Sequence, residues 1–352
     1  MLEIACTGTP YEIGLHYGSQ AAKLIKGSVE FYDDYIFRST KLNWSKVVEI
    51  ANKILPFLEK HAPHLIEELK GISEGSGVPF GSILALNTRT EVSMGMLADG
   101  CTTLAFKTAD VSVAGQNWDW ECAQKARLVL LHIKSAADTP QKPNISVVTE
   151  AGLLAKSGIN SAGVAVFINA IWARGVNFEA LPVHFALRLV LESTDRAQAV
   201  STLKSLGLGT AVHVMVADAT GATSIEGSHL DTVLLEMVDG RIAHTNHFLT
   251  EHADGVVGVH LFADTTQRME RVTKLLRAAQ APAGSDTGVS IIEHILEDDQ
   301  GFPTSINRKA TGKETSETLF SIVADLRAGT ARVRLGRPSE NEGIWNLQPA
   351  KL

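Results

Sequence analysis

The spacing of apolar residues changes near residue 103, and this change restricts the fold more than any other feature of the chain. Over residues 11–76, apolar side chains recur three and four positions apart, which is typical of amphipathic helices. Over residues 103–171, the apolar runs are short and bounded by Gly, Pro and Asp, which indicates consecutive antiparallel strands. A block of helices followed by a block of strands predicts an α+β fold, because a parallel α/β fold alternates the two.

The rest of the chain repeats this order of blocks. Two helical patterns cover residues 182–206, strand patterns follow over residues 211–248, and two more helical patterns cover residues 265–298. A last pair of strands turns at Ala328-Gly329. Stacked layers of helices and antiparallel strands satisfy this order. Because we find no internal repeat and no low-complexity linker, we expect one compact domain.

Charge and composition argue against several classes of function. Hydrophobic residues make up 45% of the chain and charged residues 20%, which is typical of a globular protein with a large core. The net charge of −7 argues against binding to nucleic acid or to anionic membranes, since both need an excess of Lys and Arg. The sequence shows no secretory signal and no apolar run of about 18 residues, so no membrane segment is expected. Three cysteines cannot form a disulfide framework, which favours a reducing compartment.

One of these cysteines, Cys101, lies where the helical pattern gives way to the strand pattern, directly after Gly100. A free cysteine is commonly a small buried apolar residue, and that interpretation stays open here. The glycine, however, leaves its own carbonyl uncrowded, so the Cys101 thiol has access to it. Attack gives a thioester, and hydrolysis of the thioester leaves Cys101 as a new N-terminus. Its α-amine, with a pKa of about 7.7–8.0, then serves as base for its own thiol.

Nine short motifs extend over almost the whole chain in the order in which a known family has them. The sequence resembles the acyl-coenzyme A:6-aminopenicillanic acid acyltransferase (isopenicillin N acyltransferase) family of Ntn hydrolases. Each motif is weak alone, and the shared order makes the resemblance specific. The motifs are GTPYEIGLHYG at 8–18, LNTRTE at 86–91, DGCTT at 99–103, GQNWDW at 115–120, TEAGLLAKSGINSAGVAV at 149–166, ALRLVLEST at 186–194, HTNH at 244–247, QRME at 267–270 and VRLGRP at 333–338.

The resemblance implies an αββα sandwich, in which two antiparallel sheets lie between helical layers. It also implies that the chain cuts itself between Gly100 and Cys101. The resulting fragments, 1–100 and 101–352, would stay together without a covalent link as a heterodimer, within the single domain 1–352.

The resemblance further implies roles for five residues. Cys101 is the nucleophile, Asp119 supports cleavage and orients the amine, and Asn246 donates its amide to the oxyanion. Arg308 pairs with a substrate carboxylate, and Ser228 is a further candidate for substrate binding. From the residues alone, other interpretations stay open. Asp119 can cap a turn, Asn246 can satisfy a buried backbone group, and Arg308 can be a solvated surface charge.

The activity that the resemblance implies is N-acyl transfer through a thioester on Cys101. An acyl-CoA, or an amide such as isopenicillin N, donates the acyl group, and an amine such as 6-aminopenicillanic acid accepts it. Acyl-CoA is then a co-substrate, and we expect no resident cofactor and no metal. Two alternatives stay open: an amidohydrolase or N-acyltransferase for a different amine in another biosynthetic pathway, and an unprocessed homologue that only binds acyl groups or a partner protein.

Two other patterns are weaker. The GISEG stretch around Ser73 matches the G-x-S-x-G motif of serine hydrolases, but that motif needs a preceding strand and a helical pattern precedes it here. His61 and His64 flank a proline, and neither this pair nor His244 with His247 has an obvious third ligand. A zinc site is therefore not expected.

The last three residues, Ala350-Lys351-Leu352, are a conservative variant of the serine-lysine-leucine peroxisomal address. Enzymes of the family resemble this sequence in ending with such a signal. We therefore expect the peroxisomal import receptor to bind these residues, with the cytoplasm as the alternative location.

Overall fold

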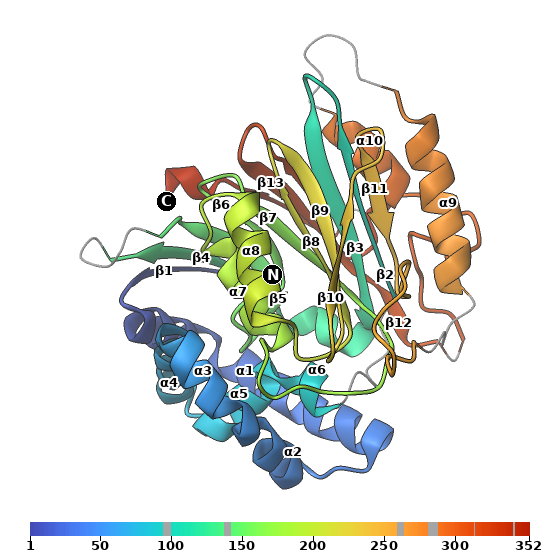
Figure 1. Ribbon diagram of the computed structural model, residues 1–352. Coiled ribbons are helices and arrows are strands. Elements are labelled where there is room, and N and C mark those ends of the chain that lie inside the picture. Colours follow the sequence, from blue (N-terminus) through green and yellow to red (C-terminus); the bar gives the residue numbers. More distant parts are fainter. Residues whose placement is uncertain (94–99, 137–141, 259–263, 281–287, 313, 341) are drawn as a thin grey trace.

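Two β-sheets lie face to face, and helices cover the outer side of each sheet in the computed structural model of the chain (Figure 1). The structure describes residues 1–93, 100–136, 142–258, 264–280, 288–312, 314–340 and 342–352. Over these residues the arrangement is an αββα sandwich, so the predicted α+β fold class is confirmed.

The larger sheet contains eight strands in the order β1-β4-β5-β6-β7-β8-β9-β10. Neighbouring strands are antiparallel, except that β1 runs parallel to β4. The strands are β1 (Leu2–Gly8), β4 (Leu128–Ser135), β5 (Ile145–Glu150), β6 (Ser157–Asn160), β7 (Ala165–Ala170), β8 (Val212–Asp218), β9 (Gly221–Gly227) and β10 (Thr232–Glu236).

The smaller sheet contains six antiparallel strands in the order β11-β2-β3-β12-β13-β14. The strands are β11 (Arg241–His244), β2 (Gly100–Lys107), β3 (Ser112–Glu121), β12 (Ser316–Asp325), β13 (Thr330–Leu335) and β14 (Ile344–Leu347). Helices α9 (Asp264–Ala278) and α10 (Val289–Leu296) pack on its outer side, against β2, β3, β11 and β12.

The other helices belong to the opposite side of the sandwich. Helices α7 (Val183–Leu191) and α8 (Arg196–Leu206) pack against strands β6 to β9. The N-terminal helices form a separate group, drawn in blue in Figure 1. They are α1 (Pro10–Thr40), α2 (Trp44–Ala51), α3 (Leu55–His61), α4 (Pro63–Ser76), α5 (Phe80–Asn87) and α6 (Arg89–Val92). None of the described helices combines the length and the apolar character that crossing a bilayer requires.

Close packing between α1 and α4 explains the GISEG stretch. Gly71 and Gly75 lie one helical turn apart on α4 and face Gly14 and Gly18 on α1. A Cβ atom on any of the four would overlap backbone atoms of the partner helix, so only glycine allows this approach. Ser73 lies inside α4 and donates to the Val78 carbonyl at 2.7 Å. This stretch therefore packs two helices together and forms no nucleophile turn.

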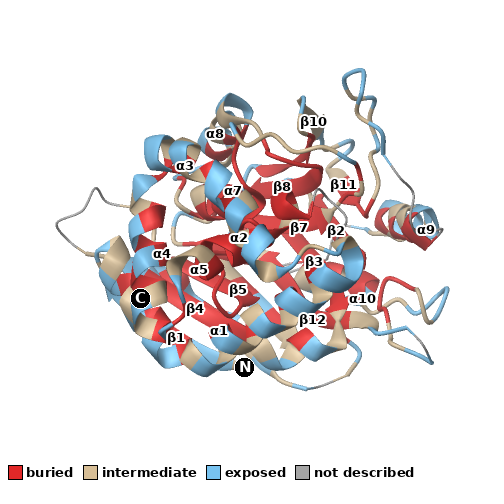
Figure 2. Cartoon of the chain, turned by 90° about the horizontal axis from the view of Figure 1, so that it is seen from below, coloured by how far each residue is buried: buried red, intermediate tan, exposed pale blue. Residues whose placement is uncertain are grey.

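The buried residues concentrate on the two sheets, and the outer faces of the helices are exposed (Figure 2). The predicted turn at 328–329 is confirmed, because β12 and β13 pair across it and Gly329 has a positive φ of 64°. The apolar spacing did not predict β1, β6 or β14 as separate strands.

Candidate active site

The register of three strands determines which residues surround the Gly100–Cys101 bond. Gly100 lies opposite Asp119 in the β2–β3 ladder, and Asp119 lies opposite Thr318 in the β3–β12 ladder. Cys101 lies opposite Trp118. Successive side chains of a strand point to opposite faces of its sheet. Asp119 and Thr318 therefore face α9 and α10, whereas Cys101 and Trp118 face the eight-stranded sheet.

The Cys101 side chain is fully buried between the two sheets. Thr103, on the same face of β2, donates to Asn169 on β7 at 2.7 Å, which shows that this face meets the other sheet. A hollow of about 40 Å³ beside Trp118 lies on this side. The hollow is lined by Arg89, Thr90, Trp118, Trp120, Lys156, Ile168, Ala170, Ile171, His184, Ala211 and Val212.

Asn246, two residues after β11, binds the nitrogen of the bond that the sequence predicts to be cut. Its Oδ1 atom accepts the Cys101 N–H at 2.9 Å, and its Nδ2 atom donates to the Ala170 carbonyl at 3.0 Å. These partners fix the orientation of the amide, because an N–H can only donate and a carbonyl can only accept. The predicted donation to an oxyanion needs the second Nδ2 hydrogen, and it stays a prediction.

Arg268, in the first half of α9, binds both Cys101 and Asn246. Its Nη1 atom donates to the Cys101 carbonyl at 2.7 Å and to the Thr102 hydroxyl at 3.2 Å. Its Nη2 atom donates to Asn246 Oδ1 at 2.8 Å. The backbone of Cys101 is therefore held at its N–H by Asn246 and at its carbonyl by Arg268.

Arg308 lies against the Gly100–Cys101 junction. Its Nη2 atom donates to the Asp264 carboxylate, and its Nε atom lies 3.4 Å from Asp119 Oδ2. The Asp119 Oδ1 atom accepts from the Thr318 hydroxyl at 2.6 Å. Arg308 is 6% exposed and Asp119 is fully buried, so pairing of Arg308 with a substrate carboxylate would require these contacts to rearrange. That predicted role has no direct support in the uncut chain.

The absence of a side chain at residue 100 makes room for this guanidinium. A Cβ atom on Gly100 would lie 2.9 Å from Arg308 Nε and 3.2 Å from its Cζ. In a Gly100→Ala variant, we therefore expect displacement of Arg308 from Asp119 and a rate of chain cleavage that is about 10–100-fold lower. Gel electrophoresis of denatured samples over time measures this rate. Cleavage at the wild-type rate would show that the contact between Gly100 and Arg308 is unimportant.

Ser228 does not contact Cys101, Asn246 or Arg308. It follows β9, donates to Asp231 Oδ1 at 2.5 Å, and accepts the N–H groups of Leu230 and Asp231. These bonds close its own turn, and its residue is 2% exposed. The role of Ser228 in substrate binding therefore stays a prediction.

The other two cysteines are poor nucleophiles. Burial, together with the nearby Glu68 carboxylate, raises the pKa of the Cys6 thiol to about 12. Burial and the Glu317 carboxylate raise the pKa of the Cys122 thiol to about 11. Both thiols remain protonated near neutral pH, so neither competes with Cys101 through a thiolate.

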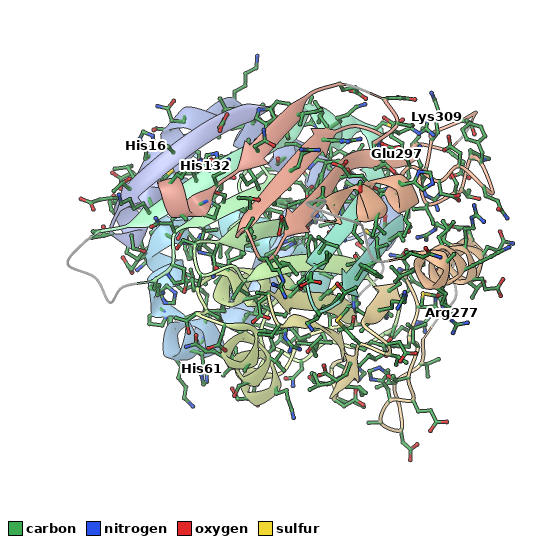
Figure 3. The ribbon with its side chains drawn as sticks, turned by 90° about the horizontal axis from the view of Figure 1, so that it is seen from above. His16, His61, His132, Arg277, Glu297 and Lys309 are labelled. Carbon is green, nitrogen blue, oxygen red and sulfur yellow. The ribbon has the colours of Figure 1, made fainter. Side chains whose placement is uncertain are left out.

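The two histidine pairs are not arranged around a common metal position in the part of the chain that the structure describes. His61 lies at the edge of the molecule (Figure 3), and His64 bonds to Glu192 at 2.9 Å. His244 bonds to Glu226 at 2.7 Å. Across the described ranges, no group of three His, Cys, Asp or Glu side chains is arranged to bind a metal ion.

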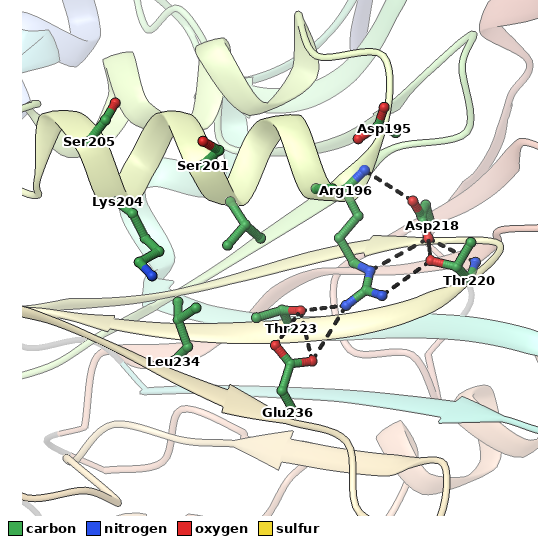
Figure 4. Close-up of a pocket in the computed structure, with 12 residues that line it drawn as sticks. Asp195, Arg196, Ser201, Lys204, Ser205, Asp218, Thr220, Thr223, Leu234 and Glu236 are labelled. Atoms are coloured by element: carbon green, nitrogen blue, oxygen red, sulfur yellow. Dashed lines mark hydrogen bonds and ion pairs between the residues drawn. The ribbon is translucent and has the colours of Figure 1, made fainter.

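A larger groove, of about 740 Å³, lies between α8 and the strands β8 to β10 (Figure 4). It contains none of the five predicted site residues. Arg196 in this groove donates to the hydroxyls of Thr220 and Thr223 and lies 3.5 Å from Glu236. We take the Cys101 region as the candidate site because buried polar groups converge there on the peptide bond of a cysteine.

Three residues at the start of α9 contact the site and carried no role in the sequence analysis. They are Asp264, Thr265 and Arg268, and Thr265 accepts the Asn246 N–H at 2.8 Å. One signal was present in the sequence. Asp264 and Arg268 are four positions apart, so both face one side of a helix, but the spacing does not reveal what that side contacts.

Comparisons with known proteins concern the family and the fold of the chain. Residues 106–340 match the family described as acyl-coenzyme A:6-aminopenicillanic acid acyl-transferase. Over its full length the chain is 36% identical to the acyl-coenzyme A:6-aminopenicillanic-acid-acyltransferase 40 kDa form of Emericella nidulans, of which it covers 97%. It is 25% identical over 230 residues to the beta-alanyl-dopamine/carcinine hydrolase of Drosophila melanogaster. This alignment covers 58% of this chain and 57% of that protein. Among solved structures, a variant of conjugated bile acid hydrolase from Clostridium perfringens matches with a TM-score of 0.52 and 16% identity. The match covers 72% of this chain and 93% of that one, and at this identity it supports the fold alone.

Proposed function

Because the chain belongs to the acyl-coenzyme A:6-aminopenicillanic acid acyltransferase family, we propose that it is a self-processing N-acyltransferase with Cys101 as its nucleophile. The observation that carries this proposal is the convergence of buried polar groups on one peptide bond. Asn246 binds the Cys101 nitrogen, Arg268 binds the Cys101 carbonyl, and Asp119 lies opposite Gly100.

We propose that processing begins with an attack of the Cys101 sulfur on the Gly100 carbonyl carbon. The peptide C–N bond breaks, and the Cys101 nitrogen gains the proton that the thiol loses, so the products are a thioester and an amine. Water then hydrolyses the thioester, which gives a carboxylate on Gly100 and restores the thiol. The bond from Asn246 Oδ1 to the Cys101 N–H holds this nitrogen in place before the reaction.

The same atoms then support acyl transfer. The free α-amine of Cys101 accepts the thiol proton, and the sulfur attacks an acyl-CoA or an amide such as isopenicillin N. The resulting acyl-enzyme passes its acyl group to an amine such as 6-aminopenicillanic acid, or to water. A thiolate suits both half-reactions because it attacks well and leaves well. Acyl-CoA is a co-substrate in this proposal, and no resident cofactor takes part.

A related activity on a different amine, with hydrolysis as the main outcome, is the second candidate. The similarity to a beta-alanyl-dopamine/carcinine hydrolase supports it. An assay of several acyl-CoA donors against 6-aminopenicillanic acid and simple amino acids separates the two candidates. Transfer to 6-aminopenicillanic acid supports the first candidate, and release of free acid regardless of the amine supports the second.

The covalent route fixes the expected kinetic pattern. With the acyl donor and the amine varied together, we expect parallel lines in double-reciprocal plots, because the first product leaves before the amine binds. Intersecting lines would indicate a complex that holds both substrates at once and would contradict a free acyl-enzyme intermediate.

An unprocessed binding protein is the rival without catalysis. It predicts that purified wild-type protein gives one band on a denaturing gel, whereas self-processing predicts two.

For the location, we propose that Ala350-Lys351-Leu352 acts as a peroxisomal address, with the cytoplasm as the alternative. Residues Pro349–Lys351 form a short 3-10 turn in which Ala350 and Lys351 are exposed, so an import receptor has access to them. A fusion of the last ten residues to a fluorescent protein tests this proposal. Punctate signal on peroxisomes supports it, and diffuse signal contradicts it.

A further inference from the structure

A single carboxylate holds the segment that carries Asn246. Glu226, on β9 of the eight-stranded sheet, accepts five hydrogen bonds. One comes from His244, the last residue of β11, and the other four come from residues after this strand. Its Oε1 atom accepts from His244 Nε2 at 2.7 Å and from the Leu249 N–H at 2.6 Å. Its Oε2 atom accepts from the Thr250 hydroxyl at 2.5 Å, from the Thr250 N–H at 3.2 Å and from His252 Nε2 at 3.3 Å.

These donors lie on both sides of Asn246. His244 precedes it by two residues, and Leu249 and Thr250 follow it by three and four. Glu226 therefore fixes the two ends of the short segment 244–250, which contains Asn246 and so the contact with the Cys101 nitrogen. From the opposite side, the Thr265 hydroxyl accepts the Asn246 N–H at 2.8 Å.

The charge state of Glu226 supports this function. Its side chain is fully buried, and burial by itself raises the pKa of a carboxyl group. The bonds from His244 and Thr250 outweigh burial and lower the pKa of Glu226 to about 2. The group is thus ionised at neutral pH and can only accept hydrogen bonds, as its five donors require.

His244 is held through both of its ring nitrogens. Its Nε2 atom lies 2.7 Å from Glu226 Oε1, and its Nδ1 atom lies 2.9 Å from the Thr245 carbonyl oxygen. The His244 ring stacks on that of His213, with centroids 3.7 Å apart and planes 1° apart. Burial and the charge of His244 lower the pKa of His213 well below its usual range, which keeps His213 neutral.

We propose that Glu226 is a positioning residue for the reaction, and that it places the Asn246 amide against Cys101 by holding residues 244–250. This inference rests on the proposed function, because it assigns Glu226 a task in self-cleavage and acyl transfer. A purely structural role is the competing explanation, since loss of any buried charged group destabilises a protein.

A double-mutant cycle separates the two explanations. In a Glu226→Gln variant, one carboxylate oxygen becomes an NH₂ group that faces donors, so the turn loses part of its support. We expect cleavage of the chain about 10–100-fold slower than in the wild type, and a similar loss in kcat with little change in KM. In an Asn246→Ala background, the same substitution should slow cleavage by less than about three-fold, because its effect acts through Asn246. Equal effects in both backgrounds would overturn the proposal.

Two control variants measure how far loss of a carboxylate or loss of stability alone changes the cleavage rate. Glu236→Gln removes a carboxylate from the neighbouring strand, where the side chain is 64% exposed, and should leave cleavage unchanged. Glu68→Gln removes a buried carboxylate that pairs with Arg188 far from Cys101, and should lower thermal stability without slowing cleavage by folded protein. If Glu68→Gln slowed cleavage as much as Glu226→Gln does, a general loss of stability would explain both variants.

A milder variant and a second readout cover poor folding of Glu226→Gln. Thr250→Val keeps the size of the side chain and removes one donor to Glu226, and we expect cleavage about two- to five-fold slower. Hydrogen exchange at the Leu249 and Thr250 amides should be faster in Glu226→Gln than in the wild type, and unchanged exchange would overturn the proposal. This readout does not depend on activity.

If wild-type protein neither cleaves nor transfers acyl groups, the proposed function fails, whereas normal cleavage by Glu226→Gln refutes only the role of Glu226.

Discussion

In a Cys101→Ala variant, we expect the purified protein to remain one chain of 37.8 kDa and to show no acyl transfer. The methyl group of alanine cannot attack the Gly100 carbonyl, so neither the cut nor the N-terminal amine forms. Since all later steps use that amine and the sulfur, we expect activity to fall by about 10⁴-fold or more. A denaturing gel and an acyl-transfer assay on the same sample measure both effects.

Ser73→Ala is the matched control for this experiment. Ser73 lies in a helix with its hydroxyl bonded to the Val78 carbonyl, and the variant should give two chains and full activity. The opposite outcome, with activity kept in Cys101→Ala and lost in Ser73→Ala, would identify a serine hydrolase and contradict the assignment of Cys101.

The second large effect is expected at Asn246. An Asn246→Ala variant loses the acceptor for the Cys101 nitrogen and the amide that the family resemblance assigns to the oxyanion. Removal of one oxyanion donor typically lowers kcat by about 10²–10³-fold. We expect a fall of this size in kcat with a small change in KM, together with slower cleavage of the chain. Steady-state kinetics on the processed fraction separates kcat from KM.

Asn160→Ala provides the comparison for a buried asparagine that lies elsewhere. The Asn160 amide donates to the carbonyls of Leu191 and Ser193, so its loss should lower stability and leave kcat of the folded protein unchanged. An Asn246→Ala enzyme with wild-type kcat, or an equal loss of kcat in both variants, would contradict a specific role for Asn246.

The sequence predicted the layers of this fold because layers depend on local patterns. The helical spacing over residues 11–76 corresponds to α1 to α4, and the short runs from residue 103 correspond to strands of both sheets. Strand β1 escaped prediction because a strand of seven residues beside helical sequence gives a weak signal. Its parallel pairing with β4 joins residues more than 120 positions apart, which no local pattern encodes.

The sequence also predicted part of the candidate site. Cys101 stood out because its neighbour is glycine, and the family resemblance supplied Asp119, Asn246 and Arg308. The structure brings these four residues together around one peptide bond. The resemblance also supplied Ser228, whose hydroxyl closes the turn after β9, and its role in substrate binding stays a prediction.

Two supporting residues were given no role by the sequence analysis. Arg268 reaches Cys101 from a helix 167 positions later in the chain. Glu226 reaches the Asn246 turn from the other sheet. Both contacts depend on how the two sheets and α9 pack, so their residues look like ordinary surface charges until the fold is known.

The most direct test of the account is the N-terminal sequence and intact mass of purified, active wild-type protein. Self-cleavage at Gly100 requires a fragment that begins Cys101-Thr102-Thr103-Leu104 and whose mass corresponds to residues 101–352. A fully active preparation that consists only of uncut chain would contradict the central claim that the α-amine of Cys101 is the base for its own thiol.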